Sequence, residues 1–462
     1  MPRRGFVTEG FMKILGTFVM PCALIFAGIV LGVKIRLFRI LSPRHFFRVL
    51  KESASTDGTS PLKAMCTALA GTLGVGNIAG VATAITAGGA GAVMWMWIGS
   101  ALSMSVKYAE VALAVKYRHR KGGHYYGGSM YTVRDGLSKY TSPRVASFLG
   151  GVFALFCIAN SLLMGNIVQT SAACSVFDIP SFTICISFAA LALFLALCPS
   201  TRLYGITYAA IPLLSGVYAI FSLCVIIPNF ACVGRCLYAV VLEAFALRPA
   251  VAGAAGFGMS RAVRYGITRG IFSNEAGCGT SPTAHAAADT PSPHHQGCFG
   301  IFEVIADTPI LCTMTALVIL IAEEKHPDVM AAYDGVPLVL AAFESVLGRA
   351  ASFIIGISVI FFALATIAAQ LLYGKVAVGY FSQTRALSYA FVISFVLCSA
   401  VAAYIPQASM WYVADATITL MTLTNVSVLL VMRREVKNIR LEFSAERDKI
   451  RQMYCNNRNN VL

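Results

Sequence analysis

Residues 71–77 read Gly-Thr-Leu-Gly-Val-Gly-Asn and lie inside an apolar segment, residues 63–86, that is long enough to cross a membrane as a helix. Each glycine destabilises a helix interior by about 1 kcal/mol relative to Ala, and a break at bilayer depth leaves backbone N–H and C=O groups without partners. Such groups can bind a ligand, because N–H groups attract a carboxylate and carbonyls attract a cation. The pattern therefore predicts a ligand-binding helix break, with close helix packing through small residues as the alternative.

A second interruption is expected in the apolar segment at residues 237–259, where residues 247–258 contain Pro249 and three glycines. Proline removes a helix donor and clashes with the preceding turn, while glycine lets the backbone approach a ligand closely. The two interruptions are five predicted spans apart. Interrupted helices in corresponding positions of two halves indicate a transporter built from inverted repeats, although glycine and proline are also common in ordinary membrane helices.

The composition places the chain in a membrane. Of its 462 residues, 57% are hydrophobic and only 12% are charged, about half the charged share of a soluble protein. The net charge of +15 is best explained by Lys and Arg in cytoplasmic loops, so no nucleic-acid partner is expected. The 14 cysteines lie mostly singly in apolar runs without a Cys-x-x-Cys motif, and buried free Cys behaves as a small hydrophobe. Whether Cys232 and Cys236 pair in an outer loop stays open.

The apolar runs predict an all-α integral membrane protein of about eleven helices. The expected parts are a leading helix at residues 1–33, a cytoplasmic connector at 34–62, five helices at 63–228, five more at 237–432, and a basic tail at 433–462. The Lys and Arg distribution puts the connector and the C-terminal tail in the cytoplasm. The same reasoning makes the basic stretch at residues 260–296 a cytoplasmic loop.

Two stretches resemble the signatures of the alanine or glycine:cation symporter family, the sodium:alanine symporters. Residues 74–85 read Gly-Val-Gly-Asn-Ile-Ala-Gly-Val-Ala-Thr-Ala-Ile, and residues 273–286 read Ser-Asn-Glu-Ala-Gly-Cys-Gly-Thr-Ser-Pro-Thr-Ala-His-Ala. The resemblance implies a LeuT-like core of two inverted five-helix repeats, preceded by one extra helix, in a bacterial cytoplasmic membrane. It also implies import of alanine, glycine or a similar small neutral amino acid by a monomer, with sodium as the coupling ion or protons as the alternative.

The candidate ligands are polar or flexible positions within the expected spans. Asn77 can coordinate sodium while N–H groups around Gly76 hold the substrate carboxylate, or it can simply cap the second half-helix. Gln169 is a lone amide in an apolar span and either contacts the substrate or joins two helices. Residues 256–258 can accept from the substrate ammonium under a Phe257 lid, unless the stretch is only a kink. The predicted sodium ligands are Thr72, Leu73, Asn77 and Thr366. The predicted substrate contacts are Gly76, Asn77, Gln169, Gly256, Phe257, Gly258, Thr366 and Gln370.

Residues 365–370 depart from the family pattern. Thr366 and Gln370 are one helical turn apart and share a face. The family usually reads Ser/Thr-Thr-Ile-x-Gly-Trp here, whereas this chain reads Ala-Thr-Ile-Ala-Ala-Gln. Ala365 removes a hydroxyl that a sodium site could use, and Gln370 replaces a Trp that should wall the pocket. We therefore expect a larger or more polar pocket, which leaves amino acids such as glutamine or serine as alternative substrates.

Glu275 and Asp307 are the expected gating residues. Glu275 falls in the basic stretch, where it can pair with Arg264 or Arg269 at an inner gate. Asp307 is near the start of a span, and an intramembrane carboxylate is a functional candidate by default, with a helix cap as the alternative.

The remaining ionisable residues receive structural interpretations. Lys107 and Glu110 are three residues apart and read as a pair or as snorkelling residues. His285, His294 and His295 lack the sequence spacing of zinc ligands.

Other classes of protein are not supported by the sequence. An enzyme would need clustered His, Asp or Glu within spans, and ATP-driven transport would need a Walker motif; neither is found. A channel would need a repeated carbonyl ring, while a sensor that binds without moving its ligand stays open.

Overall fold

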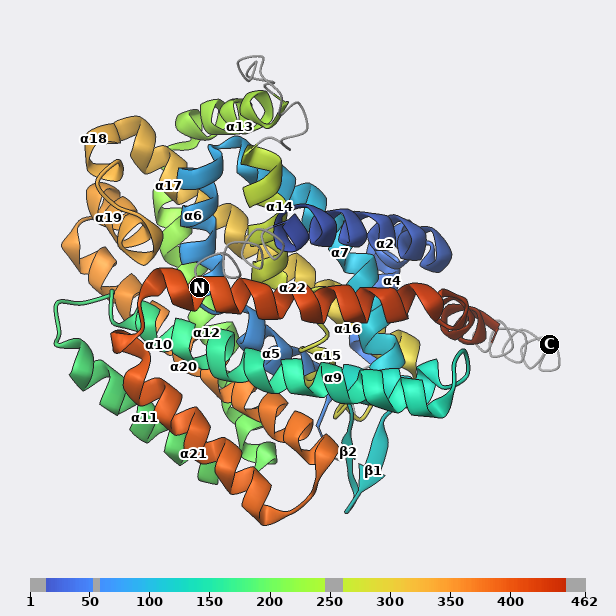
Figure 1. Cartoon of the computed structure of the whole chain (residues 1–462). Coiled ribbons are helices and arrows are strands. Elements are labelled where there is room, and N and C mark those ends of the chain that lie inside the picture. Colours follow the sequence, from blue (N-terminus) through green and yellow to red (C-terminus); the bar gives the residue numbers. More distant parts are fainter. Residues whose placement is uncertain (1–13, 53–58, 246–260, 446–462) are drawn as a thin grey trace, which may run out of the picture.

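The computed structural model describes residues 14–52, 59–245 and 261–445, and these are helical apart from turns, connecting loops and one short hairpin (Figure 1). Up to the hairpin the elements are η1 (Leu15–Val19), α2 (Met20–Ile35), α3 (Leu37–Ile40), α4 (Pro43–Glu52), α5 (Pro61–Thr72), η2 (Val75–Asn77), α6 (Ala79–Gly88) and α7 (Gly91–Lys116). The hairpin pairs β1 (His119–Lys121) antiparallel with β2 (His124–Tyr126).

After the hairpin the described residues form helices joined by turns and loops. The elements of the first half are α8 (Ser129–Tyr131), η3 (Thr132–Gly136), α9 (Pro143–Leu162), η4 (Leu163–Ile167), α10 (Val168–Ala173), α11 (Ser181–Leu197), α12 (Ser200–Ile226) and α13 (Phe230–Phe245). Those of the second half are α14 (Arg261–Asn274), α15 (Pro282–His285), α16 (Pro293–Ile305), η5 (Ala306–Cys312), α17 (Thr313–Lys325), α18 (Pro327–Met330), α19 (Gly335–Leu347), α20 (Arg349–Phe381), α21 (Arg385–Val401), η6 (Ala402–Tyr404) and α22 (Gln407–Val431).

The described residues contain 8 helices long and apolar enough to cross a membrane, or 9 when the bent pair of α5 and α6 counts as one span. The shorter apolar helices α11 and α19 accompany them. This confirms the expected all-helical membrane architecture. The span expected at residues 237–259 lies only partly within the described residues: α13 covers Phe230–Phe245, and residues 246–260 are outside the described part.

The basic stretch at residues 260–296 is not the exposed loop that the sequence predicts. Its described part forms α14, α15 and the start of α16, and nearly all side chains from residue 266 to 290 are buried. Helix α14 packs against α6 and α7, and α15 packs against α5 and α7. The stretch is therefore part of the helical core.

Three of the long helices begin at the same local signal. Ser60, Ser142 and Ser292 each precede a proline, and each side-chain oxygen accepts a hydrogen bond from the backbone N–H three residues later. Serine at this position satisfies an N–H group that the helix leaves unpaired, and proline in the first turn has no N–H to lose. This signal fixes the starts of α5, α9 and α16, two of which carry residues of the candidate site.

Helix α7 is the central element, packed against α2, α14 and α16. Helices α9 and α22 lie side by side across one face, and α11 lies beside α21 (Figure 1). Helices α13, α17 and α18 gather at one end of the bundle, while the β1–β2 hairpin projects from the other (Figure 1).

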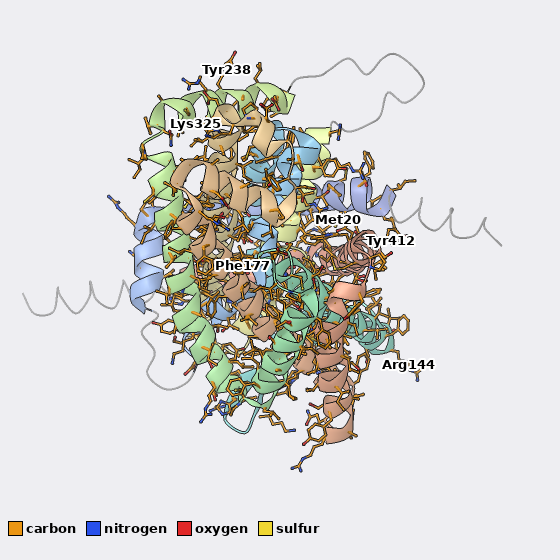
Figure 2. All side chains as sticks on the ribbon, turned by 90° about the vertical axis from the view of Figure 1, so that its left-hand side faces the viewer. Met20, Arg144, Phe177, Tyr238, Lys325 and Tyr412 are labelled. Atoms are coloured by element: carbon orange, nitrogen blue, oxygen red, sulfur yellow. The ribbon has the colours of Figure 1, made fainter. Side chains whose placement is uncertain are left out.

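The outer surface of the bundle is apolar. Large side chains such as Phe148, Phe194 and Leu213 are more than half exposed, at 69%, 61% and 67%. Side chains cover the outside of the ribbon, with Tyr238 and Lys325 at one end and Arg144 toward the other (Figure 2). An exposed apolar surface of this extent fits a bilayer as solvent rather than water.

Candidate functional site

The helix interruption expected at residues 71–77 is confirmed. Helix α5 ends at Thr72, and α6 is bent by 63° from α5. Between them Gly74 is extended, with φ −100° and ψ −151°, before one 3-10 turn. The Thr72 carbonyl accepts the Gly74 N–H at 2.8 Å, and a carbonyl with two lone pairs keeps one for a further partner. Thr72 and Leu73 are both buried, so a ligand of their carbonyls would sit inside the bundle.

Two other helices close on this break. The side-chain oxygen of Gln169, on α10, accepts the Val75 N–H at 3.1 Å. The Thr366 hydroxyl, on α20, lies 2.8 Å from the Ala70 carbonyl oxygen at the end of α5. Of the two roles predicted for Gln169, the joining of helices is the one seen in this conformation. Its contact with substrate, like that of Thr366 with substrate or sodium, remains a prediction.

Gly74 lies where these two side chains converge. A Cβ atom here would be 2.5 Å from Thr366 Oγ1 and 2.8 Å from Gln169 Oε1. In contrast, a Cβ on Gly80 in α6 would meet nothing within 4 Å. A glycine is therefore needed at position 74, because neighbouring side chains leave no room for a Cβ atom. Position 80 has room for a larger residue.

We expect Gly74→Ala and Gly80→Ala to change stability in opposite directions. Overpacking typically destabilises by about 1–3 kcal/mol, and Gly74→Ala must displace two hydrogen-bonded side chains. Gly80→Ala adds a better helix former without a clash and should stabilise by up to about 1 kcal/mol. Thermal unfolding of both variants in detergent checks the expectation. Equal melting temperatures for the two would contradict it.

Asn77 connects the first break to η5. Its side-chain Nδ2 donates to Asp307 Oδ1 at 2.6 Å. Its Oδ1 atom is buried and has no hydrogen-bond partner among the described residues. An unsatisfied buried acceptor typically costs about 1–3 kcal/mol, so this oxygen is available to a cation or to a donor group of a bound molecule. The geometry supports the predicted ligand role of Asn77 without excluding a structural one.

Asp307 is fully buried and held only by neutral donors. It lies within the continuous span Pro293–Lys325, so the helix-cap alternative is wrong. Its Oδ2 accepts from the hydroxyls of Ser273 and Thr308, each at 2.7 Å. No Lys, Arg or His of the described residues forms an ion pair with it. Because an uncompensated buried charge is very costly, the arrangement suits the binding of a cation or a proton.

A second interrupted helix faces the first. Helix α14 ends before residues 275–281, and α15 resumes after them. Glu275, Gly277 and Gly279 have positive φ angles of 48°, 90° and 75°, which reverse the helical path. A Cβ on Gly76 would lie 3.6 Å from the Cα of Ser273, so the two breaks meet. Helix α14 packs against α6, and α15 packs against α5, so each half of one interrupted helix contacts a half of the other.

The break at residues 275–281 was not predicted from the sequence. The interruption expected at residues 247–258, with Gly256, Phe257 and Gly258 as substrate contacts, lies outside the described residues. The observed break was signalled by two glycines and Pro282 within the stretch Ser-Asn-Glu-Ala-Gly-Cys-Gly-Thr-Ser-Pro. The nearby arginines masked that signal, because they indicated a water-exposed loop.

Glu275 does not form the predicted ion pair with Arg264 or Arg269. Its side chain is buried, and it accepts from Gln370 Nε2 at 3.1 Å and from the Thr280 hydroxyl. The other amide atom of Gln370, its Oε1, is buried without a partner among the described residues. Gln370 thus links α20 to the second break and offers one free acceptor there. A gating role for Glu275 stays a prediction.

Lys107 neither snorkels nor pairs with Glu110. Its fully buried Nζ donates to Ser281 Oγ at 2.7 Å and lies 3.3 Å from Glu303 Oε1. The second oxygen of Glu303 is 3.0 Å from His285 Nε2. This network joins α7, the second break, α15 and α16 in the interior. The structural role predicted for His285 is consistent with this contact, but the sequence did not predict the network.

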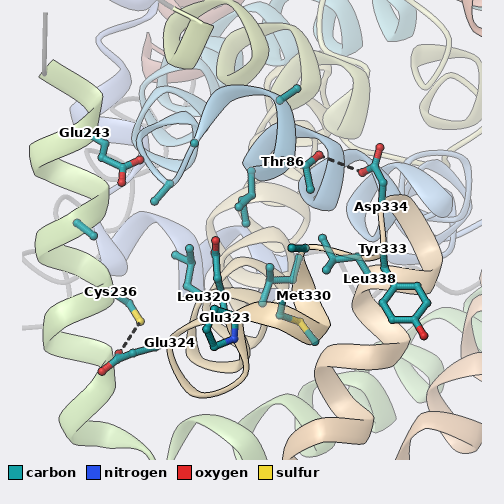
Figure 3. Close-up of a pocket in the computed structure, with 18 of the residues that line it drawn as sticks. Thr86, Cys236, Glu243, Leu320, Glu323, Glu324, Met330, Tyr333, Asp334 and Leu338 are labelled. Carbon is teal, nitrogen blue, oxygen red and sulfur yellow. Dashed lines mark hydrogen bonds between the residues drawn. The ribbon is translucent and has the colours of Figure 1, made fainter. Parts of the chain in front are cut away.

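A cavity of about 1120 Å³ opens beside the far end of α6, between α13, α17 and α19 (Figure 3). At its rim the Thr86 hydroxyl donates to Asp334 Oδ1 at 3.0 Å. Cys232 and Cys236 on α13, whose pairing was left open, are both free thiols. The charged residues that line the cavity are Arg235, Glu243, Glu323, Glu324 and Asp334. Four carboxylates against one guanidinium make it attractive to cations.

Comparison with known proteins shows relatives that match most of the chain. The sodium:alanine symporter family matches residues 6–457. The sodium/alanine symporter AgcS of Methanococcus maripaludis is 33% identical over 395 residues, 83% of each chain. The uncharacterised transporter YflA of Bacillus subtilis is 32% identical over 425 residues, 90% of this chain and 88% of the relative. The probable sodium/glutamine symporter GlnT of the same species is 29% identical over 436 residues, 92% and 86%.

A solved structure shares the fold. A manganese transporter of Eremococcus coleocola, crystallised with an aromatic bis-isothiourea compound, superposes with a TM-score of 0.50 at 12% identity, covering 84% of this chain and 87% of that one. The expected LeuT-like fold is thereby confirmed. Together with the family match and these relatives, this shows that the chain belongs to the sodium:alanine symporter family, and is a cation-coupled amino-acid transporter of the membrane rather than an enzyme.

Proposed function

We propose that the chain imports a small neutral amino acid of the alanine or glycine type by sodium symport with alternating access. The observation that supports this most strongly is Asp307, a buried carboxylate whose hydrogen-bond donors are all neutral. A monovalent cation there would compensate the charge. Protons are the alternative coupling ion, because protonation of the same carboxyl would also neutralise it.

Asp307 is also placed to couple the ion to conformation. One of its oxygens is bonded by Asn77 of the first break and the other by Ser273 at the end of α14. A cation that binds here therefore acts on both interrupted helices at once. Coupling requires the ion to prefer one conformation, and a carboxylate bonded to both interrupted helices would provide that preference when the two helices move relative to each other. On this proposal Asp307 acts as an ion ligand, and its predicted role in gating follows because ion binding acts on both interrupted helices.

The substrate would lie where the two breaks meet. N–H groups near Gly76 are suited to the carboxylate of an amino acid. The proposed sodium ligands are Asp307 together with Thr72, Leu73, Asn77 and Thr366. Gln370 supports a second candidate, the carriage of a larger or more polar neutral amino acid. Its unpaired Oε1 can accept from a hydroxyl or amide of such a substrate.

The charges at the two ends suggest the orientation. The acidic cavity by α13 and α17 would face outside, where it would concentrate sodium. The hairpin carries Arg118, Arg120 and Lys121, and residues 433–445 are also basic, so the positive-inside rule places both in the cytoplasm. We infer that the chain functions as a monomer in a bacterial cytoplasmic membrane with its C-terminus inside.

Uptake of labelled alanine into proteoliposomes tests the proposal. A sodium gradient should drive accumulation that an equal potassium gradient does not. Accumulation that follows a pH gradient without sodium would identify the proton instead. Sodium-dependent binding without uptake would indicate a sensor, and the absence of both would exclude alanine as the substrate.

Competition assays test the larger pocket. Glutamine, asparagine, serine and threonine should inhibit alanine uptake comparably to glycine, and Gln370→Leu should weaken inhibition by these polar amino acids about 5-fold relative to glycine. The factor corresponds to the net value of about 1 kcal/mol for one hydrogen bond. A ranking of alanine and glycine far above all four in the unmodified protein would refute the larger pocket.

A further inference from the structure

Three metal-ligating side chains meet at a place that the transport mechanism does not use. His45 comes from α4, while His294 and Cys298 are one turn apart on α16. The two Nε2 atoms are 3.4 Å apart. Cys298 Sγ is 3.6 Å from His45 Nε2 and 3.7 Å from His294 Nε2. The sequence spacing of the histidines gave no sign of this, because one ligand lies about 250 residues before the other two.

The three distances match the edges of a tetrahedral zinc site. Zinc binds nitrogen at about 2.0–2.1 Å and sulfur at about 2.3 Å, which puts two nitrogens about 3.4 Å apart and a nitrogen and a sulfur about 3.6 Å apart. Two imidazoles and one thiol therefore already have the separations that a shared ion imposes.

The surroundings orient the ligands as metal sites usually require. Tyr108 Oη lies 2.6 Å from His294 Nδ1, the ring nitrogen on the side away from the cluster. A hydrogen bond at the second nitrogen of a ligating histidine fixes its tautomer and leaves Nε2 free to bind. Phe443, in the helical residues 433–445 that follow α22, stacks on the His294 ring at 4.2 Å. His294 and Cys298 are buried, and only His45 is partly open to solvent.

The fourth position would open onto a cavity of about 290 Å³ that includes His45 and His294 in its wall. The other charged residues that line it are Arg39, Arg44, Arg48 and Arg440. These guanidinium groups disfavour a bare dication, so the bound ion would need the Cys298 thiolate and would take water or an anion as its fourth ligand. A phosphate alone would suit the arginines but would not explain the position of the thiol.

We propose that His45, His294 and Cys298 form a binding site for a thiophilic divalent cation of the zinc class, which ties α4 to α16. Helix α4 belongs to the connector between the leading helix and the first break, and α16 carries Glu303. The bound ion would thus hold α4 of the connector against α16, the helix that contributes Glu303 to the buried network of Lys107. This inference is independent of the substrate and the coupling ion.

Cobalt and zinc binding to the purified full-length protein tests the site. After stripping with chelator in detergent, the protein should bind one Co²⁺ per chain with a sulfur-to-cobalt charge-transfer band, and Zn²⁺ should displace it. Cys298→Ser should abolish the band and lower zinc affinity more than about 100-fold, since second-shell changes alone cost about 10–100-fold. Tyr108→Phe should keep the band and weaken zinc binding within that range.

Matched variants separate metal binding from folding. Cys185→Ser removes another buried thiol, and His295→Ala alters the neighbouring histidine; both should bind Co²⁺ as the unmodified protein does. If Cys298→Ser does not elute as a folded protein on gel filtration, His45→Ala, which changes the partly exposed ligand on the connector, replaces it. This variant should likewise lower zinc affinity. No stoichiometric Co²⁺ binding by the folded protein, or a charge-transfer band that survives Cys298→Ser, would overturn the site. Binding of inorganic phosphate without cobalt would assign the cavity to an anion.

Discussion

Asp307→Asn is expected to lower sodium-driven alanine uptake by more than about 100-fold while leaving the protein folded. The substitution keeps the size of the side chain and an acceptor for Asn77, but it removes the negative charge. Changes outside the first coordination shell of a metal typically cost about 10–100-fold, so loss of a direct carboxylate ligand should cost more. Initial uptake rates in proteoliposomes at saturating sodium measure the effect.

Two comparisons make the Asp307 result specific. Asp328→Asn removes a carboxylate from the exposed helix α18 and should leave uptake unchanged. Asn77→Ala should also abolish ion-dependent uptake without reducing expression, because it removes both the bond to Asp307 and the unpaired buried oxygen. Near-normal sodium-dependent uptake by Asp307→Asn would remove this carboxylate from the ion site.

The sequence located the first break well because its signal is local. Three glycines within residues 71–77 weaken the helix wherever the segment lies, and no distant partner is needed to infer this. The second break depends on tertiary contacts. Arg269 lies over the Trp411 ring at 5.1 Å and 4.0 Å from the Asp415 carboxylate, which allows an arginine to occur beside the core. A charge count along the chain cannot show such partners.

The polar interior was the least predictable part of the site. Glu275 and Gln370 are 95 residues apart, and Asn77 and Asp307 are 230 residues apart. Each residue could be selected individually as a polar group in an apolar setting, but their pairing depends on how the helices pack. The same limit explains why Lys107 was interpreted as a partner of Glu110 or as a snorkelling residue, although its contacts with Ser281 and Glu303 make it a core residue.

Lys107→Met is expected to destabilise the protein by about 3–5 kcal/mol, the typical cost of removing one partner of a buried ion pair. The size of the side chain is nearly kept, so the effect isolates the charge. Glu303 would retain His285 at 3.0 Å but lose its lysine, and Ser281 in the second break would lose its donor. Denaturant or thermal unfolding in detergent measures the change.

The double variant Lys107→Met/Glu303→Gln tests whether the stability lost in Lys107→Met comes from leaving the Glu303 charge unpaired. If an unpaired buried charge is the cause, neutralising Glu303 as well should recover most of the lost stability, since replacing both members of a buried pair is often neutral. Lys121→Met on the exposed hairpin strand β1 should stay within about 0.5 kcal/mol of the unmodified protein. A Lys107→Met variant as stable as this control would mean that the buried pair does not hold α7, the second break and α16 together.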